Sequence, residues 1–598
     1  MINRRNIGLN FNAEGIAIVR LWAPNAETVS LQLDNRKVTI PLEKVDFGNW
    51  ELLTSQVKPG DDYFFVVDDK ELPDPASLFQ PDGVHGPSQA VDLHDFEWTD
   101  GDWKNPDQEG YIIYELHAGT FSADGTFEGI ASKLDHLIDL GINAIEIMPV
   151  AQFPGERNWG YDGVFPFAVQ NSYGGAKGLM KLIDTCHQKG LAVILDVVFN
   201  HIGPEGNYLP EFGAYFTDKY KTPWGNAINF DDANCDAVRS FYVENALMWF
   251  RDFHVDTLRL DAVHAIKDFS PKHILQEIKE AVDKLITLTG KAHYLMVELD
   301  LNDHRFINPI EKCGYGMDAQ WIDEFHHALR VTAGGGRDGY YSDFNGIADI
   351  AKSYKDAYVY DGIYSAERQK TFGNKVDENP GKQFIVFSQN HDQVGNRMLG
   401  ERSSQLFDFE MQKLMAGAVL VSPYLPLLFM GEEWSAQSPF QYFVSHSDPE
   451  LIEAVQKGRK EEFAAFHAKG EAPDPQAEET FIGSKLNWDE LESDQHKKMF
   501  DYYKVLIALR KELPALRTLN RKNLTVSFNV GQQTLFLERW HDEQKVCCVM
   551  NFSKNEYPVS LPGDDYVNKI FDSADSRFNG PGLLIAHIQP QSLIIYTN

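Results

Sequence analysis

Residues 255–264, with the sequence VDTLRLDAVH, constrain the fold of this chain more than any other stretch. The stretch begins as an apolar strand and ends in ionisable side chains, since Arg259, Asp261 and His264 follow where the chain leaves the core. Apolar strands with polar groups at their carboxyl ends build the mouth of a (β/α)8 barrel. One such strand proves little, but the same design recurs along the chain, and the recurrence predicts the fold.

Eight strand candidates alternate with helical segments in the central part of the chain. The strands are expected at 111–116, 144–150, 191–199, 255–260, 293–297, 318–321, 384–388 and 426–430. Helices with apolar residues at steps of three and four are expected at 126–140, 178–189, 235–253, 270–287 and 408–421. This alternation predicts an α/β fold, a (β/α)8 TIM barrel with insertions. A doubly wound open sheet is the alternative, and the lack of a G-x-G-x-x-G motif after the first strand weakens it.

Short runs of β-branched and aromatic residues precede the central part. They are separated by turn sequences and lie at 16–22, 28–33, 50–53 and 63–67. This spacing predicts an N-terminal immunoglobulin-like β-sandwich at 1–98. A polar stretch at 94–110 is expected to be the linker to a catalytic domain at 99–522.

Similar runs return after the central part. They lie at 524–528, 534–540, 546–551 and 593–596, and they predict a C-terminal β-sandwich at 523–598. Between the eighth strand and this domain, a polar insertion at 435–488 contains a charged helical stretch at 449–467 and a loop at 470–476. The insertion either shapes the rim of the site or forms a solvated face. The segment 498–516 is expected to be the last barrel helix.

Charge and composition exclude several kinds of partner. The formal net charge is −33, from 55 Lys and Arg against 88 Asp and Glu, which argues against nucleic acid or an anionic membrane as a partner. A neutral ligand is therefore the easier expectation. The amino terminus lacks the apolar segment of a signal peptide, and no run of about 18 apolar residues occurs, so we expect a cytoplasmic protein.

Polar residues gather at the carboxyl ends of four predicted strands. They are Asp196, Asn200 and His201, then Arg259, Asp261 and His264, then Glu298 and Asp300, and then Asn390, His391 and Asp392. Retaining glycoside hydrolysis needs one carboxylate as nucleophile and one carboxylic acid as proton donor. Metal-dependent hydrolysis is the alternative, because His and Asp are also metal ligands. No H-x-H or H-E-x-x-H spacing supports it.

Four short motifs resemble the conserved regions of the α-amylase family, glycoside hydrolase family 13, in the same order. They are DVVFNH at 196–201, LRLDAVH at 258–264, VELD at 297–300 and QNHD at 389–392. The resemblance implies that Asp261 is the nucleophile, Glu298 the general acid and base, and Asp392 the carboxylate that stabilises the transition state. It also implies four substrate-binding residues: Arg259 orients the nucleophile, His201 and His391 bond the sugar, and Tyr161 stacks on it.

These assignments are physically coherent. Arg259 lies two residues before Asp261, on the same side of a strand, and a fixed cation there favours the ionised nucleophile. Glu298 needs surroundings that favour its protonated form. Burial and a neighbouring carboxylate must raise its pKa for it to donate a proton near neutrality. Val297 and Leu299 flank this acid where the family pattern suggests alanines, a departure that leaves the acid itself unaffected.

Within that family the chain resembles the maltooligosyltrehalose trehalohydrolases over nearly its whole length. Further matching motifs are ELHAGTF at 115–121, DEFHHA at 323–328, HDQVGN at 391–396 and FMGEEW at 429–434. The resemblance implies hydrolysis of the α-1,4 bond between a maltooligosaccharide and a terminal trehalose, with release of trehalose. It also implies a carbohydrate-binding-module-like N-terminal domain, no cofactor, and a functional pairing with a maltooligosyltrehalose synthase. Calcium occurs in parts of the α-amylase family near the position of Asn200, but no oxygen-rich cation loop is recognisable in this sequence, so we expect no required metal. An α-glucan branching enzyme, a debranching or amylase-type enzyme, and a non-catalytic glucan-binding protein are the alternatives.

Recognition of the trehalose unit is expected to involve the loop after the sixth strand. The candidate residues are Asp323, Glu324, Phe325, His326 and His327, together with His264, Gln393 and Asn396. A helix start and ordinary loop packing are the alternative roles for these residues. Three tryptophans, Trp159, Trp224 and Trp434, are candidates for sugar stacking or for core packing.

Overall fold

Eight parallel strands close into a barrel at the centre of the chain, in a computed structural model that describes residues 2–34, 37–465, 472–563 and 565–598. The barrel strands are β10 (Ile113–Leu116), β11 (Ala144–Ile147), β14 (Ala192–Val197), β17 (Thr257–Leu260), β18 (Tyr294–Val297), β19 (Ala319–Trp321), β22 (Phe384–Phe387) and β23 (Leu425–Phe429). The last strand pairs with both β22 and β10, which closes the ring. All eight predicted strands are confirmed, and the doubly wound alternative is wrong.

Helices cover the barrel from outside. The long ones are α4 (Gly175–Gln188), α6 (Cys235–Arg251), α7 (Ile274–Thr289), α12 (Phe409–Leu420) and α15 (Asp494–Glu512). The helix expected at 126–140 is instead two helices, α2 (Phe127–Ala131) and α3 (Leu134–Leu140), because the chain turns at Ser132 and Lys133. Gly290 ends α7 in a left-handed conformation with φ 72°, and Asp408 caps the start of α12.

The other helices lie in loops, in the insertion or after the last barrel helix. They are α1 (Ala118–Phe121), α5 (Leu209–Phe212), α8 (Asp323–Thr332), α9 (Ile347–Asp356), α10 (His391–Gly395), α11 (Ser403–Leu406), α13 (Pro449–Ala465), α14 (Glu478–Gly483) and α16 (Pro514–Arg517). The charged helix expected at 449–467 is α13, and its last two expected residues, like the start of the loop at 470–476, fall outside the described residues. No helix in the described part of the chain is long and apolar enough to cross a membrane.

Three two-stranded hairpins extend the loops of the barrel. They are β12 (Ala151–Gln152) with β13 (Phe165–Val169), β15 (Phe216–Thr222) with β16 (Gly225–Ile228), and β20 (Ile363–Ser365) with β21 (Lys370–Phe372). The first two follow β11 and β14, and the third follows α9. The hairpins therefore add backbone structure around the carboxyl ends of the strands, where the predicted site lies.

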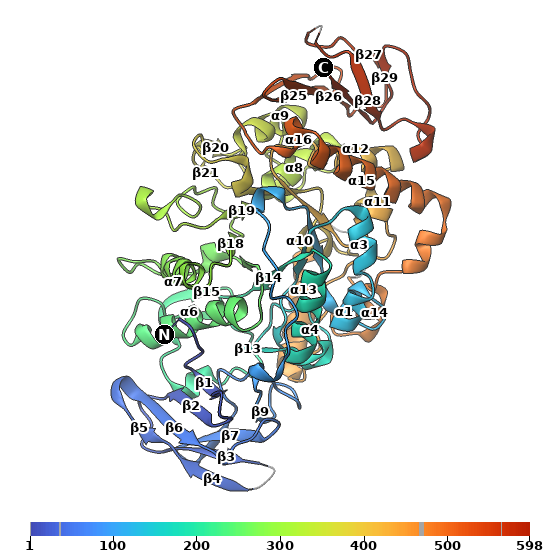
Figure 1. Cartoon of the computed structure of the whole chain (residues 1–598). Coiled ribbons are helices and arrows are strands. Elements are labelled where there is room, and N and C mark those ends of the chain that lie inside the picture. The colour runs from blue at the N-terminus through green and yellow to red at the C-terminus, as the bar shows by residue number, and fades with distance from the viewer. Residues whose placement is uncertain (1, 35–36, 466–471, 564) are drawn as a thin grey trace.

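Two antiparallel sheets form the N-terminal β-sandwich, shown in blue at one end of the molecule (Figure 1). One sheet contains β1 (Gly8–Phe11), β2 (Ala17–Trp22), β6 (Asn49–Thr54) and β5 (Glu43–Lys44); the other contains β4 (Val38–Pro41), β3 (Val29–Leu33), β7 (Asp62–Val67), β8 (Lys70–Leu72) and β9 (Ser88–Gln89). Buried and partly exposed residues alternate along β3, as expected for a strand with one face on a core. The predicted sandwich is confirmed.

The C-terminal sheets lie at the opposite end of the molecule, in red (Figure 1). The larger sheet contains β24 (Leu524–Asn529), β25 (Thr534–His541), β26 (Gln544–Asn551), β30 (Ser592–Thr597) and β28 (Asn568–Asp572), and the smaller one pairs β27 (Tyr557–Pro558) with β29 (His587–Ile588). Cys547 packs with Ile588 between these sheets, whereas Cys548 belongs to the core shared with the barrel helices. Adjacent strand residues point to opposite faces, so this C-terminal β-sandwich has a second apolar face against the barrel.

The stretch at 94–110 packs on the barrel and is more than the polar linker expected from its composition. The Trp98 ring stacks on His254 with centroids 3.9 Å apart, and the Trp103 ring stacks on His187 at 4.6 Å. Asp100 contacts His187 Nδ1 at 2.8 Å, and the other ring nitrogen of His187 contacts Asp256, which directly precedes β17. We call this stretch the N-face strap, because it ties the N-terminal domain to the amino ends of the barrel strands.

Candidate active site

The barrel interior changes from apolar to ionisable towards the carboxyl ends of the strands. The buried apolar layer includes Ile113, Ala144, Ile194 and Met296. Two residues further along the same strands lie Glu115, Glu146, Asp196 and Glu298. Because every second side chain of a strand points to the same side, these carboxyl groups also face the interior. The barrel therefore holds a layer of acidic groups above an apolar floor.

Arg259, at the same depth on β17, holds this layer together. Its Nη1 donates to Asp196 Oδ2 at 2.8 Å and to Asp261 Oδ1 at 2.9 Å, and its guanidinium lies over the Trp321 ring at 4.4 Å. Arg259 has no exposed surface, and the surrounding carboxylates outweigh the effect of burial and raise its pKa. A permanent cation therefore bridges Asp261 and the barrel interior.

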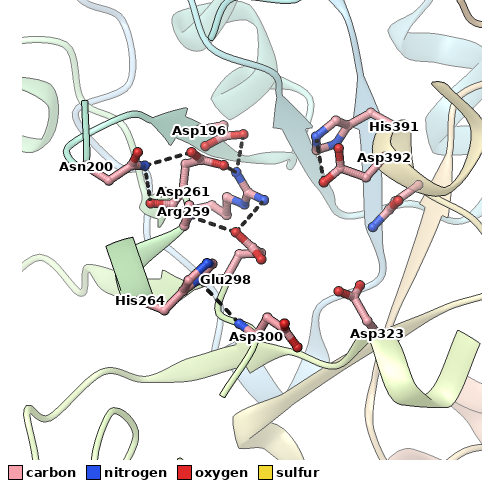
Figure 2. A network of polar contacts seen from close by, with 12 residues as sticks. Asp196, Asn200, Arg259, Asp261, His264, Glu298, Asp300, Asp323, His391 and Asp392 are labelled. Atoms are coloured by element: carbon pink, nitrogen blue, oxygen red, sulfur yellow. Dashed lines mark hydrogen bonds and ion pairs between the residues drawn. The ribbon is translucent and has the colours of Figure 1, made fainter. Parts of the chain in front are cut away.

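Asp261 is held through both carboxylate oxygens. Asn200 Nδ2 donates to Asp261 Oδ2 and to its backbone oxygen, each at 2.8 Å, while Arg259 binds Oδ1. Figure 2 shows these contacts converging on one carboxylate. An amide and a guanidinium therefore fix the position of the Asp261 carboxyl group from both sides.

Glu298 has different surroundings, although Arg259 is also its neighbour. Its Oε2 accepts a hydrogen bond from the Ala262 backbone N–H at 2.7 Å and lies 3.8 Å from Arg259 Nη2. Burial raises the pKa of Glu298 to about 8; Arg259 opposes this shift, and Asp261 adds to it together with Asp323 and Asp392. Glu298 is thus protonated at neutral pH, as expected for a proton donor.

Ala262 occupies the position between the two key carboxyl groups in an unusual conformation. Its φ of 40° and ψ of 46° lie in the left-handed region, which costs free energy for a residue with a Cβ. This conformation directs its N–H at Glu298 directly after Asp261. The strained backbone at Ala262 therefore links Glu298 to the strand end that carries Asp261.

His391 lies at the other side of the site and is bonded on both ring nitrogens. Its Nδ1 donates to Glu115 Oε1 at 2.5 Å, and its Nε2 lies 2.8 Å from the Tyr161 hydroxyl, which itself donates to Asp196 at 2.7 Å. Burial lowers the pKa of His391, but Asp392 and Glu115 outweigh it and raise the pKa to about 9. His391 is therefore a cation at neutral pH.

Asp392 and Asp323 face Asp261 and Glu298 across the site (Figure 2). Asp392 Oδ2 lies 3.5 Å from His391 Nε2, and Asn396 donates to Asp392 Oδ1 at 3.1 Å. Burial, and then the charge of Asp392, raises the pKa of Asp323 to about 7. The arrangement surrounds a common space with carboxyl groups from the ends of four strands.

The residues predicted at the rim are brought to the same region. Gln393 donates to Asp323 Oδ1 at 3.3 Å, and the Asp300 backbone N–H donates to His264 Nδ1 at 3.4 Å. His201 is buried, its Nε2 donates to the backbone oxygen of Tyr161 at 2.9 Å, and burial lowers its pKa. The other ring nitrogen of His201, Nδ1, contacts Asn200 Oδ1 at 2.5 Å, so a ligand could bond His201 only if one of these contacts is exchanged. Gln393, Asp323 and His264 present polar atoms that a hydroxylated ligand can use.

Glu324 and Phe325, the next two residues of α8, point away from the site. Glu324 accepts hydrogen bonds from Asn302 Nδ2 at 2.5 Å and from the Tyr360 backbone N–H at 3.1 Å, and burial raises its pKa to about 8. Phe325 has no exposed surface and packs in the main core. Because successive helix residues turn by about 100°, neighbours in sequence face different surroundings.

Two predicted histidines of α8 differ in their surroundings. His326 Nδ1 donates to the backbone oxygen of Ser388 at 2.6 Å, and its Nε2 lies 3.1 Å from the Tyr341 hydroxyl, so both ring nitrogens are used within the protein. His327 is half-buried, and its ring contacts Tyr340 with centroids 5.0 Å apart. Tyr340 is 43% exposed, so His327 lies closer to the surface than His326.

The three candidate tryptophans differ in how exposed their rings are. Trp224 is 49% exposed, and its ring stacks on His201 with centroids 4.2 Å apart and planes 5° apart. Trp159 is buried, stacks on Phe440 and meets His391 edge-on. Trp434 has no exposed surface. Trp224 alone of the three has a ring face near the site that is not covered by the core.

Three residues of the network were quoted in the sequence motifs without a role. Asp196 receives hydrogen bonds from Arg259 and Tyr161, Asn200 positions Asp261, and Glu115 binds His391. The sequence feature that could have identified them is their position, because Glu115 and Asp196 lie near the carboxyl ends of barrel strands and Asn200 lies three residues after the end of one. Glu146 shares that position on β11, and no motif included it.

The insertion contributes to the rim of the barrel. Arg459 of α13 donates to the backbone oxygen of Gly395 at 3.2 Å, and the Arg459 guanidinium lies over the Tyr442 ring. Gly395 belongs to α10, the helix that begins at His391. Of the two roles considered for 435–488, shaping the rim is therefore the one that these contacts favour.

Two family models match the chain. The catalytic domain of the alpha amylases matches residues 95–224, and Carbohydrate-binding module 48, the isoamylase N-terminal domain, matches residues 6–81. A malto-oligosyltrehalose trehalohydrolase from Saccharolobus solfataricus is 50% identical over 84% of this chain and 87% of its own length. The protein of the same name from Arthrobacter ramosus is 42% identical over 83% of this chain and 87% of its length.

Solved structures share the architecture. A crystal structure of a Salmonella typhimurium protein proposed to be an alpha amylase superposes with a TM-score of 0.91 and 36% identity, covering 99% of this chain and 100% of that one. A pullulanase from Paenibacillus barengoltzii has a TM-score of 0.72 at 19% identity, which shows the fold alone. By contrast, a 1,4-alpha-glucan branching enzyme from Bacillus cereus is 25% identical over 94% of this chain and 84% of its own length.

Proposed function

Since the chain belongs to the malto-oligosyltrehalose trehalohydrolase family, within the α-amylase-type glycoside hydrolases, we infer that it is a retaining glycosidase. It hydrolyses the α-1,4-glucosidic bond next to the terminal trehalose of a maltooligosyltrehalose. The products are free trehalose and a maltooligosaccharide.

One observation supports the proposed mechanism above others: two neighbouring carboxyl groups have opposite surroundings. Asp261 is bound by a guanidinium at 2.9 Å and an amide at 2.8 Å, whereas Glu298 is largely enclosed, has other carboxyl groups as neighbours and has its pKa raised to about 8. Such a pair can supply a nucleophile and a proton donor at one pH. We assign Asp261 as the nucleophile and Glu298 as the general acid and base.

In the first step, Glu298 donates its proton to the glycosidic oxygen while an oxygen of Asp261 attacks the anomeric carbon. The bond from that carbon to the leaving oxygen breaks, trehalose departs, and the maltooligosaccharide is bound covalently to Asp261. In the second step, Glu298 takes a proton from water, and the water oxygen attacks the same carbon. The maltooligosaccharide is released, and both carboxyl groups return to their starting states.

We propose that Asp392 and His391 act on the sugar whose bond is cleaved. Asp392 is 44% exposed in the site and is a neighbour of Glu298, so its carboxylate can stabilise positive charge on that sugar and accept from its hydroxyls. His391, a cation held by Glu115 and Tyr161, can donate only if one of its present bonds is exchanged. Tyr161 and His201 complete this side of the site.

Recognition of trehalose is proposed for four polar residues on the leaving-group side that are partly or fully exposed: Asp323, Gln393, Asn396 and His264. His327 belongs to the same rim. For Glu324, Phe325 and His326 we propose a supporting role in place of direct contact, because their polar atoms are bonded within the protein and Phe325 is enclosed in the core.

Product analysis on maltotriosyltrehalose beside maltopentaose tests the proposed function. Rapid release of trehalose from the first, with the second nearly untouched, is expected. Comparable cleavage of both would make the protein an amylase-type enzyme, and longer or branched glucans, detected by iodine staining of amylose, would make it a transferase. Two finer points remain proposals: that the enzyme acts in the cytoplasm, which cell fractionation tests, and that it acts with a maltooligosyltrehalose synthase, which a coupled conversion of maltooligosaccharide tests.

A further inference from the structure

Phe47, in the turn between β5 and β6, combines an exposed aromatic side chain with a strained backbone. Its side chain is 92% exposed, and its backbone has φ 60° and ψ 28°. Left-handed backbone is strained for a bulky residue, and a fully exposed aromatic ring forgoes the benefit of burial. Residues with strained backbone angles cluster at functional sites, so we ask whether Phe47 belongs to a binding site.

Hydrogen bonds fix the turn that carries Phe47. Trp22 Nε1 donates to the Phe47 backbone oxygen at 3.2 Å, and the Ala23 N–H donates to Gly48 O at 3.0 Å. Gly48 has φ 75°, and a Cβ there would lie 2.5 Å from Pro24 Cβ. The backbone of Phe47 therefore has a fixed position, and this position holds its ring outside the core.

Phe47 lines a cavity of about 490 Å³ between the N-terminal β-sandwich and the barrel domain. Arg20 and Asn49 line it from the β-sandwich, and Asn234 and Asp236 line it from the start of α6. We call this cavity the inter-domain groove. Its volume is typical of a small-molecule site. Of its three aromatic residues, Trp22 and Tyr215 are buried and Phe47 is exposed, and guanidinium, amide and carboxylate groups complete the lining.

The two walls of the inter-domain groove are docked firmly. The Trp22 ring meets the Tyr215 ring edge-on with centroids 5.4 Å apart. Gly213 permits this approach, because a Cβ there would lie 2.6 Å from the Trp22 ring. The groove is therefore formed before any ligand binds, which lowers the cost of binding.

A second cavity continues from the groove. It has a volume of about 610 Å³, shares Asn6 and Arg20 with the first, and runs along β2 and β6 past Ile18 and Leu53. Leu53 is 68% exposed. Together the cavities form an elongated surface, which suits a chain ligand better than a single sugar.

We propose that the inter-domain groove is a second binding site for a linear α-glucan, with Phe47 as the stacking platform. The C–H face of a sugar ring packs against the electron-rich face of an aromatic ring, and the lining residues Arg20, Asn234 and Asp236 offer donors and acceptors for its hydroxyls. Residues 6–81 match a carbohydrate-binding module, which agrees with a sugar ligand. The match does not identify the residues that bind the sugar. The choice of an α-glucan rests on the proposed function.

This site is separate from the catalytic centre but adjoins the same hairpin. Tyr215, at the groove, directly precedes β15, and Trp224, in the turn between β15 and β16, stacks on His201 of the active site. A glucan bound in the groove therefore lies on the structure that carries one wall of the active site. Its role is to hold a long substrate on the enzyme between catalytic events.

Native gel electrophoresis through amylose tests the proposal in the hydrolysis-deficient Glu298→Gln protein. Saturating maltotriosyltrehalose in the gel occupies the active site, so the remaining retardation measures the second site. Adding Phe47→Asn is expected to abolish this retardation, because it removes the ring while Asn tolerates the left-handed backbone. Phe47→Trp keeps a ring and is expected to remain retarded.

Phe528→Ala, which removes a 43% exposed phenylalanine from the C-terminal domain, is the matched control and should be retarded like the parent. The melting temperature of Phe47→Asn should equal or exceed that of the parent, which separates lost binding from lost folding. Equal retardation of Phe47→Asn and the parent would overturn the proposal, as would a parent that amylose does not retard. Trehalose release by the wild-type enzyme is assayed separately, so a failure of the proposed function is distinguishable from a failure of this site.

Discussion

Glu115 and Glu146 are register partners on the adjacent strands β10 and β11, yet their surroundings are opposite. Glu115 accepts from the His391 backbone N–H at 3.0 Å and from His391 Nδ1 at 2.5 Å. Neither carboxyl oxygen of Glu146 has a hydrogen-bond partner among the described residues, and the side chain has no exposed surface. Burial, and then the charge of Glu115, raises the pKa of Glu146 well above its usual value. Glu115 is thus the partner of His391, whereas burial favours the neutral form of Glu146 beside it.

This pair makes a sharp prediction about activity. Glu146→Gln replaces a neutral acid by a neutral amide of similar shape, so we expect kcat/KM at neutral pH to change by less than about threefold. Glu115→Gln removes the carboxyl group bound to His391, and because hydrogen bonds to a charged group such as the His391 cation contribute about 1.5–3 kcal/mol, kcat/KM should fall roughly 10- to 100-fold. Trehalose release by the two variants measures the difference. An equal loss in both would show that Glu146 is ionised and serves the site.

Glu298→Gln should affect substrates according to their leaving groups. With maltotriosyltrehalose, the loss of proton donation should lower kcat by about 10²–10⁴-fold. An α-maltosyl fluoride should lose much less, because fluoride departs with little protonation. Asp261→Asn is expected to abolish both reactions, since it removes the nucleophile. If Glu298→Gln slowed both substrates equally, Glu298 would not be the proton donor.

The pH dependence of kcat/KM should have an alkaline limb set by Glu298. Its pKa of about 8 means that the acid is protonated below pH 8 and loses its proton as the pH rises through that value. Because the protonated form donates to the leaving oxygen, activity should fall above about pH 8. Steady-state rates on maltotriosyltrehalose from pH 5 to 10 measure this. Residual activity of Glu298→Gln should lack the limb; a limb that persists there belongs to another group.

Arg259→Lys should be damaging although the charge is kept. The guanidinium contacts Asp196 and Asp261, lies 3.8 Å from Glu298 and covers the Trp321 ring, and an ammonium group cannot make these contacts together. Truncating a buried charge pair costs roughly 3–5 kcal/mol, so we expect kcat to fall by at least about 10²-fold. Arg577→Lys, an exposed position in the C-terminal domain, is the control and should be unchanged. Near-normal kcat in Arg259→Lys would mean that charge alone suffices.

The N-face strap should make stability depend on pH. Burial lowers the pKa of His187, but Asp100 and Asp256, at 2.8 and 2.9 Å, outweigh it and raise the pKa. A pKa raised on folding adds stability that is complete below the unfolded value of about 6.5 and is lost as pH rises through the folded value. His187→Gln should therefore lower the melting temperature more at pH 6 than at pH 9. His541→Gln, exposed in the C-terminal domain, should show no such difference; an equal deficit at both pH values in His187→Gln would exclude the charged histidine.

Local sequence determined the alternation of elements and the chemistry of the strand ends. The eight barrel strands follow from short apolar runs, and Asp261, Glu298 and Asp392 follow from polar residues at their carboxyl ends, because strand direction alone brings those ends to one face. Elements whose boundaries depend on turns were predicted less well. The helix expected at 126–140 is two helices, since apolar periodicity continues across a turn that packing creates.

Tertiary structure decided which polar residues reach the site. Asp323 and Phe325 are two residues apart in α8, but the helix turns the first towards Glu298 and the second into the core. The sequence predicted the same role, recognition of trehalose, for both. Glu115 and Glu146 occupy equivalent strand positions, and only the approach of His391 from the distant end of β22 gives Glu115 a hydrogen-bond partner, while Glu146 has none among the described residues. The N-face strap has the composition of a linker, yet two tryptophans and Asp100 pack it onto the barrel. Periodicity is encoded by neighbours along the chain, whereas protonation state and contact depend on groups that only folding brings together.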